Sequence, residues 1–511
     1  MTKEISRIKQ PPIIIGLVAP LGVDINPIIK SFEKEFEGKG YRSTLIKVTD
    51  YFKEILPDFK CKENPTYSER IVELIKAGNE ICKTYNDPAI LARLCVKLIS
   101  ESNAETERGL ARGTRKVYIV RQFKREDEVG FLRSIYGNLF FQVSIFSNRK
   151  KRLEYLTQSI ADSQYQIDAH QFTGDAQKLI ERDEREKDND FGQQVGKIFH
   201  HADYLINADV QEGVETQVQR FVNLLFGSNF ISPTREEYGM FLAASAALRT
   251  LDLSRQVGAA VFSPTSEIIS MGCNEVPKGG GGSYWADAGG FDARDYKLGQ
   301  DPNEKRKVAN AVDILKRLQK EHIIKEDIAV TDLVEDDVVK ESLMMDVLEF
   351  GRIVHAEMMA ITDAARAGKS LKDATLYCTT FPCHMCAKHI VASGITRVVY
   401  LEPYPKSSAI DLHGDSIQTD ETGDEQYKDF EKATFSHFCG ITPRRYMELF
   451  HRGKRKGKAG NVQEWAQGVP EPVVNIHIPS YAGFETIVAT DFDKEIAAKF
   501  EEYASANKLN K

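Results

Sequence analysis

The sequence lacks the features of disulfide-stapled, membrane-spanning and strongly basic proteins. Its 511 residues include only eight cysteines, which are too few for a disulfide scaffold. No apolar run approaches the roughly 18 residues that a membrane helix needs, and Met1 is followed by neither an apolar signal core nor a cleavage site. The formal net charge of -7 argues against a main role in gripping duplex nucleic acid, although a local basic patch stays open. We expect a cytoplasmic protein that does not associate with membranes.

The features that are present indicate an ordinary globular chain of two or three domains. With 42% hydrophobic and 28% charged residues, the chain can build a sizeable hydrophobic core. A chain of 511 residues is too long to fold around a single hydrophobic core. Cys383 and Cys386 form a close pair, which in a reducing compartment points to a metal or to catalysis. The remaining cysteines are isolated and by default small buried apolar residues: Cys61, Cys82, Cys95, Cys273, Cys378 and Cys439.

The first part of the chain, residues 11–228, alternates short apolar runs with longer helical patterns. The predicted strands are 13–18, 43–48, 117–120, 140–146 and 204–206. The predicted helices lie at about 24–38, 67–83, 88–101, 127–136, 149–163 and 212–226. This alternation is typical of a parallel sheet covered by helices, so we predict an α/β domain.

A second α/β domain is predicted over residues 230–450. A helix at 237–248 precedes a hairpin of strands 256–262 and 267–272, and a run of four glycines at 279–282 then forces a loop. Regular structure resumes with a helix at 352–367, a strand at 374–380, a helix at 383–393 and a strand at 397–401.

Two further segments are charged. Residues 283–345 we interpret as an insertion, which is a lid, an effector site, a contact surface or a solvated elaboration without function. Residues 451–511 are predicted to be a C-terminal extension. Its basic run 452–458 is either a solvated tail or a contact to nucleotide phosphates, RNA or a neighbouring subunit.

Three residues at two predicted helix starts match the ligands of a catalytic zinc site. His355 lies near the start of one helix, and Cys383 and Cys386 open another after Pro382. Catalytic zinc takes three protein ligands and leaves one position for water. Cysteines at positions i and i+3 of a helix start share a face near the positive end of the helix, which favours thiolates. We therefore predict Zn2+ held by His355, Cys383 and Cys386.

Glu357 decides between catalytic and structural zinc, because a structural site would have a fourth ligand and no use for a nearby carboxylate. His-x-Glu followed by Pro-Cys-x-x-Cys is the signature of zinc nucleobase deaminases, in which the glutamate is not a ligand. Bound zinc lowers the pKa of water from about 15.7 to near 7, and Glu357 would move protons to the ring nitrogen and the leaving amine. His384 and His389 are expected to be surface or core side chains. We predict a hydrolytic deaminase with Glu357 as its catalytic residue.

Residues 375–400, which contain Thr-Phe-Pro-Cys-His-Met-Cys, and residues 254–259, Ser-Arg-Gln-Val-Gly-Ala, closely resemble the deoxycytidylate deaminases. The resemblance covers about 230–450 and implies the cytidine deaminase fold, an α/β/α domain with a mixed sheet. In that branch the segment corresponding to 272–279 contacts sugar and phosphate. The resemblance therefore implies that Asn274 and Lys278 bind substrate. The alternatives are that Asn274 is a turn residue and that Lys278 is a solvated loop side chain.

The whole chain resembles the bacterial two-domain deoxycytidine nucleotide deaminases associated with defence against phage, in which a P-loop-kinase-like unit precedes the deaminase. Gly16 and Gly22 bracket a segment that follows a strand and opens a helix, as a phosphate-cradling loop does. Val23 stands where a working loop has lysine, so kinase activity is doubtful. A nucleotide-sensing role for this unit stays open. The positive charge that binds the nucleotide phosphates would then come from basic residues, each of which is alternatively a solvated surface side chain: Arg121, Lys124, Arg125, Arg182 and Arg185.

The resemblance implies deamination of dCTP or dCMP, and depletion of a DNA precursor if the substrate is dCTP. One alternative is a deaminase of bases in RNA or single-stranded DNA, against which the net acidity counts. Another is a regulatory scaffold with structural zinc and a nucleotide-sensing front domain, against which Glu357 counts. The resemblance also implies a homo-oligomer, while a dNTP effector and a regulatory RNA stay open as partners.

Overall fold

The computed structural model divides the chain into two compact units, Met1–Glu237 with Cys439–Lys511, and Tyr238–Phe438. The second unit is therefore inserted into the chain of the first. The structure describes residues 7–60, 62–104, 115–186, 189–210, 213–287, 289–290, 292–420, 427–463 and 470–509, so Cys61 lies outside the described residues. Within these ranges no helix has both the length and the apolar character needed to cross a bilayer.

The first unit contains a six-stranded sheet in the order β12-β5-β4-β1-β3-β2. Its strands are β1 (Ile13–Val18), β2 (Arg42–Lys47), β3 (Lys116–Arg121), β4 (Phe140–Phe146), β5 (Tyr204–Asn207) and β12 (Gly440–Ile441). All neighbouring pairs are parallel except β12 with β5. The five strands predicted from the sequence are confirmed. The apolar runs of β1, β3, β4 and β5 are the buried centre of this sheet, whereas β2 is an edge strand and is mostly half-buried.

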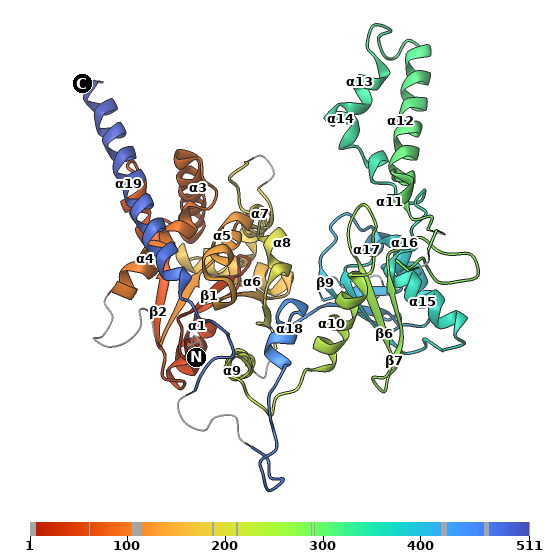
Figure 1. Cartoon of the computed structure of the whole chain (residues 1–511). Helices are drawn as coiled ribbons and strands as arrows, with labels where there is room; N and C mark the ends of the chain where they lie inside the picture. The colour runs from red at the N-terminus through yellow and green to blue at the C-terminus, as the bar shows by residue number, and fades with distance from the viewer. Residues whose placement is uncertain are drawn as a thin grey trace. The chain divides into compact units, whose positions relative to one another are not determined.

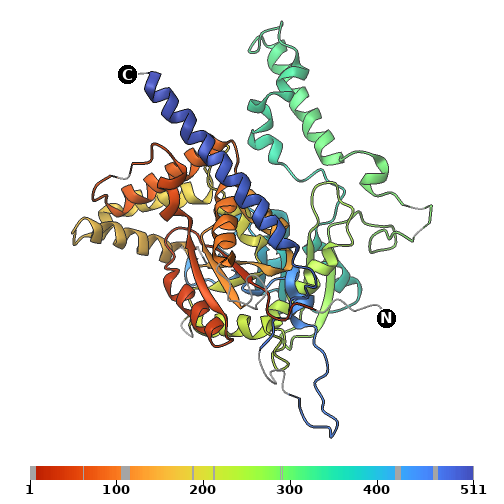
Figure 2. The same cartoon turned by 60° about the vertical axis from the view of Figure 1, so that its left-hand side comes forward.

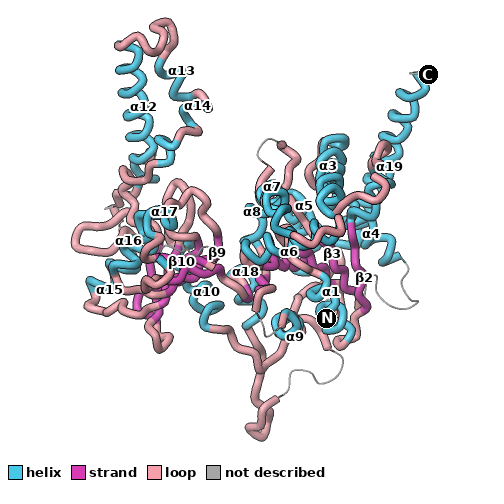
Figure 3. The backbone as a smooth tube through the Cα atoms, turned by 180° about the vertical axis from the view of Figure 1, so that it is seen from behind, coloured by secondary structure: helices cyan, strands magenta, loops and turns pink. Residues whose placement is uncertain are grey.

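Helices cover this sheet on both faces. They are α1 (Asn26–Glu37), α2 (Phe52–Ile55), α3 (Tyr67–Tyr85), α4 (Ile90–Ala104), α5 (Glu126–Tyr136), α6 (Arg149–Ser163), α7 (Thr173–Glu184), α8 (Val195–Ile198), α9 (Val214–Leu225), α18 (Pro443–Phe450) and α19 (Ser480–Leu509). The sheet lies between α1 and α9 on one side and α4, α5 and α19 on the other (Figures 1 and 3). The six predicted helices are confirmed to within a few residues, whereas α2, α7, α8, α18 and α19 were not predicted.

The C-terminal part of the chain corrects the predicted domain boundaries. We expected the second domain to end near residue 450 and 451–511 to be an extension, but residues 439–511 belong to the first unit. β12 extends the first sheet, and the Arg445 guanidinium donates to the buried Asp203 carboxylate at 3.1 Å. The basic run is tied down at its start, because Arg452 donates to the carbonyls of Ser228 and Leu224 at the end of α9.

Helix α19 packs lengthwise on α4 (Figure 2). Phe492 is 1% exposed at this contact, and the fully buried Glu485 carboxylate accepts hydrogen bonds from the Asn103 side-chain amide at 3.1 and 3.2 Å. The ion pairs Arg93–Glu495 and Lys97–Asp493 flank the contact at 2.7 and 2.9 Å. The last helix is thus part of the first unit's core.

The chain leaves the first unit after Glu237 and returns to it at Cys439. The residues of the first unit next to both connections are bound to one buried carboxylate, that of Glu237. It accepts two hydrogen bonds from the Arg220 guanidinium, each 2.7 Å long. It also accepts the backbone N–H groups of Thr234 and Ile441, each at 2.8 Å. Thr234 precedes the first connection and Ile441 follows the second, so Glu237 fixes both to α9.

The second unit contains a mixed six-stranded sheet in the order β10-β11-β9-β8-β6-β7. Its strands are β6 (Gly258–Phe262), β7 (Ile268–Cys273), β8 (Thr375–Thr380), β9 (Arg397–Glu402), β10 (Ile417–Thr419) and β11 (Ala433–His437). β6 is antiparallel to both β7 and β8, and the other pairs are parallel. The predicted hairpin and the predicted mixed α/β sheet are therefore confirmed.

The helices of the second unit fall into two groups. α10 (Arg235–Ala247), α15 (Ala356–Arg366), α16 (His384–Ala392) and α17 (Ala409–His413) lie against the sheet, and α11 (Asp295–Leu298), α12 (Pro302–Lys320), α13 (Val330–Glu335) and α14 (Asp337–Lys340) belong to the predicted insertion. α12, α13 and α14 form an arm that stands away from the sheet (Figure 1). The arm has a small core of Ala311, Val334 and Met345.

Candidate metal centre

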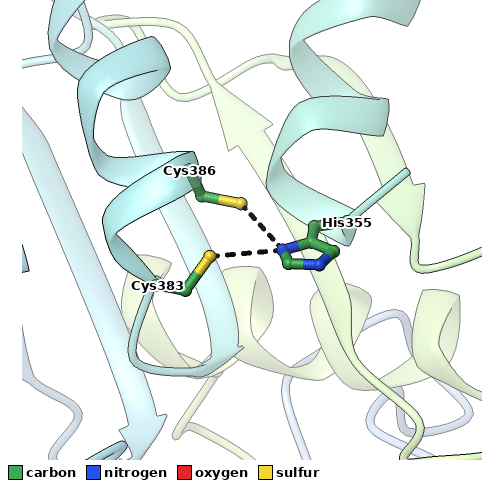
Figure 4. A group of neighbouring side chains, drawn as sticks. All are labelled: His355, Cys383 and Cys386. Carbon is green, nitrogen blue, oxygen red and sulfur yellow. Dashed lines mark hydrogen bonds between the residues drawn. The ribbon is translucent and has the colours of Figure 1, made fainter. Parts of the chain in front are cut away.

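The three predicted ligands gather at the starts of α15 and α16. The Nδ1 atom of His355 lies 3.3 Å from the Cys383 sulfur and 3.4 Å from the Cys386 sulfur. Figure 4 shows the imidazole and both thiol groups directed toward one another. All three ligand atoms lie within 4.8 Å of each other, and among the described residues no fourth His, Cys, Asp or Glu joins the group.

Local structure explains why these side chains meet. His355 and Cys383 are the N-cap residues of α15 and α16, where extended backbone turns the side chains toward the helix starts. β7 runs very close to α15, since a Cβ on Gly272 would lie only 2.2 Å from the Ala356 carbonyl oxygen. Glycine is therefore required at this strand position to hold the start of α15 beside the sheet.

The electrostatics of this group favour a thiolate at Cys383. The hydrogen bond from Cys386 and the contact with His355 lower the pKa of Cys383 to about 4. The hydrogen bond with Cys383 in turn raises the pKa of His355 to about 9. Metal ions bind cysteine as the thiolate, so a thiol that loses its proton readily is suited to bind a metal ion in the proton's place.

The donor set and its spacing fit zinc. Zn–S bonds of about 2.3 Å and Zn–N bonds of about 2.0–2.1 Å place tetrahedral nitrogen and sulfur ligands about 3.6 Å apart. The observed distances of 3.3 and 3.4 Å between His355 and the two sulfurs need only a small expansion. Three ligands without a fourth protein donor are typical of catalytic rather than structural zinc.

Glu357 lies in the first turn of α15 beside the group but is not a member of it. Its side chain is only 4% exposed, and burial raises the pKa of its carboxyl group. The carboxylate has hydrogen-bonding contacts with Cys386 and with the buried Cys378 of β8. The isolated Cys378 is predicted only as a small buried apolar residue, because no motif in the sequence signals this contact.

Asn274 lies beside the centre, directly after β7, and its side-chain amide is hydrogen-bonded within the protein. Its Nδ2 group donates to the Asp252 carboxylate and to the Arg255 carbonyl oxygen, and its Oδ1 atom accepts from the Val257 N–H at 2.8 Å. Asp252 is close enough to help raise the pKa of His355. Asn274 therefore holds the loop 252–257 next to the centre. Lys278 is exposed in the glycine turn, and substrate contact by either residue stays a prediction.

The returning segment of the arm borders the ligand helix α16. The Glu349 carboxylate lies 3.8 Å from the ring of His384, which stands between Cys383 and Cys386 in the sequence. The Asp346 carboxylate pairs with Lys406 at 2.6 Å, and Leu348 packs on the core that contains Cys383 and Cys386. Asp346, Leu348 and Glu349 follow the predicted insertion 283–345, so the chain that leaves the arm, and not the insertion itself, borders α16, while His389 is exposed.

The candidate phosphate loop of the first unit differs from its prediction. Gly16 lies inside β1, where a Cβ would be 2.7 Å from the rings of Phe123 and Phe140, so it serves packing and not a loop. Gly22, with a φ of 90°, does lie in the turn after β1. Arg121 ends β3, and Lys124 is 9% exposed. The Lys124 ammonium donates to the Asp183 carboxylate at 2.6 Å and to the Ala19 carbonyl at 3.0 Å.

Residues 233–402 match the family model described as "Cytidine and deoxycytidylate deaminase zinc-binding region". This segment includes His355, Glu357, Cys383 and Cys386. The chain is 52% identical over 54 residues to deoxycytidylate deaminase of Enterobacteria phage T4, which is 11% of this chain and 28% of that protein. It is 42% identical over 53 residues to ComE operon protein 2 of Bacillus subtilis, which is 10% of this chain and 28% of that protein.

These matches are local, since the chain spans less than a third of the length of these curated relatives. Among solved structures, the dCMP deaminase of cyanophage S-TIM5 in complex with dCMP and dUMP aligns with 18% identity and a TM-score of 0.22. The alignment covers 40% of this chain and 98% of that one. The comparisons thus identify a deaminase-type zinc-binding segment in the second unit.

Proposed function

We propose that the second unit is a zinc-dependent hydrolytic deaminase of deoxycytidine nucleotides. The observation that carries the proposal is the convergence of His355, Cys383 and Cys386 within 4.8 Å, with the buried Glu357 beside them and no fourth ligand among the described residues. The matched deaminase family model over 233–402 supports the reaction class. Zinc in this position supplies Lewis acidity that activates a water molecule at neutral pH.

Glu357 is the proton carrier in this proposal. Its carboxylate oxygen takes a proton from the attacking water and delivers it to N3 of the cytosine ring. It then takes the remaining proton from the hydroxyl added at C4 and transfers it to the exocyclic nitrogen, which leaves as ammonia while the carbonyl of uracil forms. Burial, which raises the pKa of Glu357, makes its carboxylate a stronger base for accepting a proton from the water. The contacts with Cys378 and Cys386 keep the carboxyl group oriented.

The proposed substrates are dCMP and dCTP, and consumption of dCTP would deplete a DNA precursor during phage infection. The support for dCMP is the local identity to phage deoxycytidylate deaminases. The support for dCTP and for a defence role is the resemblance of the whole two-unit chain. Purified protein should be incubated with dCMP, dCTP, CTP, cytidine and a cytosine-containing oligonucleotide, and loss of the amine followed by ultraviolet difference. Inertness toward both deoxynucleotides would refute the proposal, and reaction of the oligonucleotide alone would favour a nucleic-acid deaminase.

Three variants separate catalysis from metal binding. Glu357→Gln should retain zinc at the wild-type ratio and lose at least about a hundredfold in kcat, as expected for removal of a general acid–base. Cys386→Ser should lose both zinc and turnover. His389→Ala, an exposed change on the same helix, is the control and should retain both. A Glu357→Gln protein that deaminates at the wild-type rate would contradict the assigned role, and full biological activity without turnover would support a scaffold.

A further inference from the structure

The arm of the second unit carries opposite charges on its two sides. Helix α12 has six basic and two acidic residues between Pro302 and Lys320. The acidic segment, residues 321–346, contains α13 and α14 and has nine acidic and two basic residues. The acidic segment packs back against α12, so the two run side by side along the arm (Figures 1 and 3). The arm therefore has one basic and one acidic side.

The two sides of the arm do not neutralise each other. Within residues 292–420, which the structure describes without a gap, no ion pair joins α12 to the acidic segment. The pairs formed within the arm each stay on one side: Lys307–Glu304 and Arg317–Asp313 on α12, and His322–Glu326 and Lys340–Glu335 on the acidic segment. Most of the charge on each side is therefore available to a partner.

Large apolar side chains are exposed among these charges. Ile314 of α12 is 45% exposed, and Val338 and Leu343 of the acidic segment are 83% and 88% exposed. The small core of the arm, which contains three buried side chains, leaves them uncovered. Apolar side chains that are exposed between charged ones are typical of a surface that binds another protein.

A second copy of the arm fits both sides at once. A two-fold rotation about the long axis of the arm places α12 of each copy over the acidic segment of the other, so both contacts join opposite charges. Since α12 has 19 residues, it is about 28 Å long and about 10 Å wide, and each contact covers about 300 Å² on each copy. The two contacts together bury about 1,200 Å², the lower limit for a specific interface. An unrelated acidic or basic partner would match one side only.

We propose that the arm is a self-association surface, through which two copies of this chain pair in parallel with arm against arm. In a parallel pair, residues at the same height along the arm meet. Lys316 and Lys320 near the tip of α12 therefore face Asp327 and Asp332 of the second copy, which follow the tip closely in the sequence. The exposed apolar side chains become buried between the two arms, while the charges fix the register and exclude wrong partners.

The test measures self-association of the full chain, fluorescently labelled, by sedimentation velocity at low salt. One variant combines Lys316→Glu with Lys320→Glu, and the other combines Asp327→Lys with Asp332→Lys. Each variant alone should dimerise about tenfold more weakly or worse, because both contacts then bring like charges together. An equimolar mixture of the two variants should pair to within about threefold of the wild-type affinity, since opposite charges then meet at both contacts.

The matched control combines Lys30→Glu with Lys53→Glu, two exposed lysines of α1 and α2. It changes the net charge as much as the first variant does, and its affinity should equal that of the wild type. Recovery on mixing shows that the separate variants are folded. The proposal is overturned by a monomeric wild type, by wild-type affinity in either arm variant, or by a mixture that pairs no better than its components.

Discussion

The Glu237 carboxylate allows a quantitative test of how the first unit holds its C-terminal segment. Glu237→Ala removes four hydrogen bonds, two from Arg220 and one each from the backbones of Thr234 and Ile441. Breaking a buried ion pair costs about 3–5 kcal/mol. Because Arg220 is 22% exposed and can rehydrate, the lower end applies, about 3 kcal/mol. β12, only two residues long, has little other pairing to compensate.

The expected effect is local opening of the returning chain. A loss of about 3 kcal/mol corresponds to exchange about a hundredfold faster for amides whose protection depends on this contact. Hydrogen exchange measured by mass spectrometry should show this acceleration in peptides covering β12 and α18. Peptides from β8 and β9 in the second unit should be unaffected. Glu37→Ala, an exposed change in α1, is the control.

Two outcomes would refute this reasoning. Exchange in β12 and α18 that stays within about threefold of the wild type would mean that the carboxylate adds little to the contact. Equal acceleration in both units would mean that the substitution destabilises the whole chain. A double-mutant cycle with Arg220→Ala should give a coupling free energy of about 2 kcal/mol or more, because the pair is bidentate and buried at Glu237.

Three further predictions concern the two units. Gly272→Ala should lower both zinc content and melting temperature, because its Cβ would clash with α15, whereas Gly279→Ala, which has open space, should change neither; unchanged zinc content would contradict the close approach. Asn274→Ala should destabilise the protein by about 1–3 kcal/mol in urea unfolding, since the Val257 N–H loses its acceptor. A chain ending at residue 479 should bind the dye ANS, because deletion of α19 exposes the apolar face of α4. If this chain does not bind ANS, α19 is not part of the first unit's core.

Local sequence patterns predicted much of the fold and the candidate centre. β1, β4 and α6 have the predicted bounds, because continuous apolar runs and an Asn148 N-cap are signals contained within the elements themselves. The ligand group could be predicted because the helix-start positions of His355, Cys383 and Cys386 are fixed by local spacing.

The remaining features depend on contacts distant in sequence. A two-residue strand such as β12 has no periodicity, and its pairing with β5 depends on a partner more than 230 residues away. Gly16 reads as a loop glycine until the rings of Phe123 and Phe140 are placed against it. Lys124 reads as a free cation until α7 brings Asp183 to it. Each error came from a tertiary partner that no local pattern specifies.

The insertion of one unit within the other also sets the order in which a ribosome can complete them. Strand β5 leaves the exit tunnel long before its edge partner β12, because all of Tyr238–Phe438 must be synthesised in between. At about 5–20 residues per second, those roughly 200 residues delay the final strand by about 10–40 s. During that interval the face of α4 that α19 will cover is exposed to solvent and to chaperones. At its end the metal-binding unit has every residue it needs to fold, while β12 and α19 are still missing from the first unit.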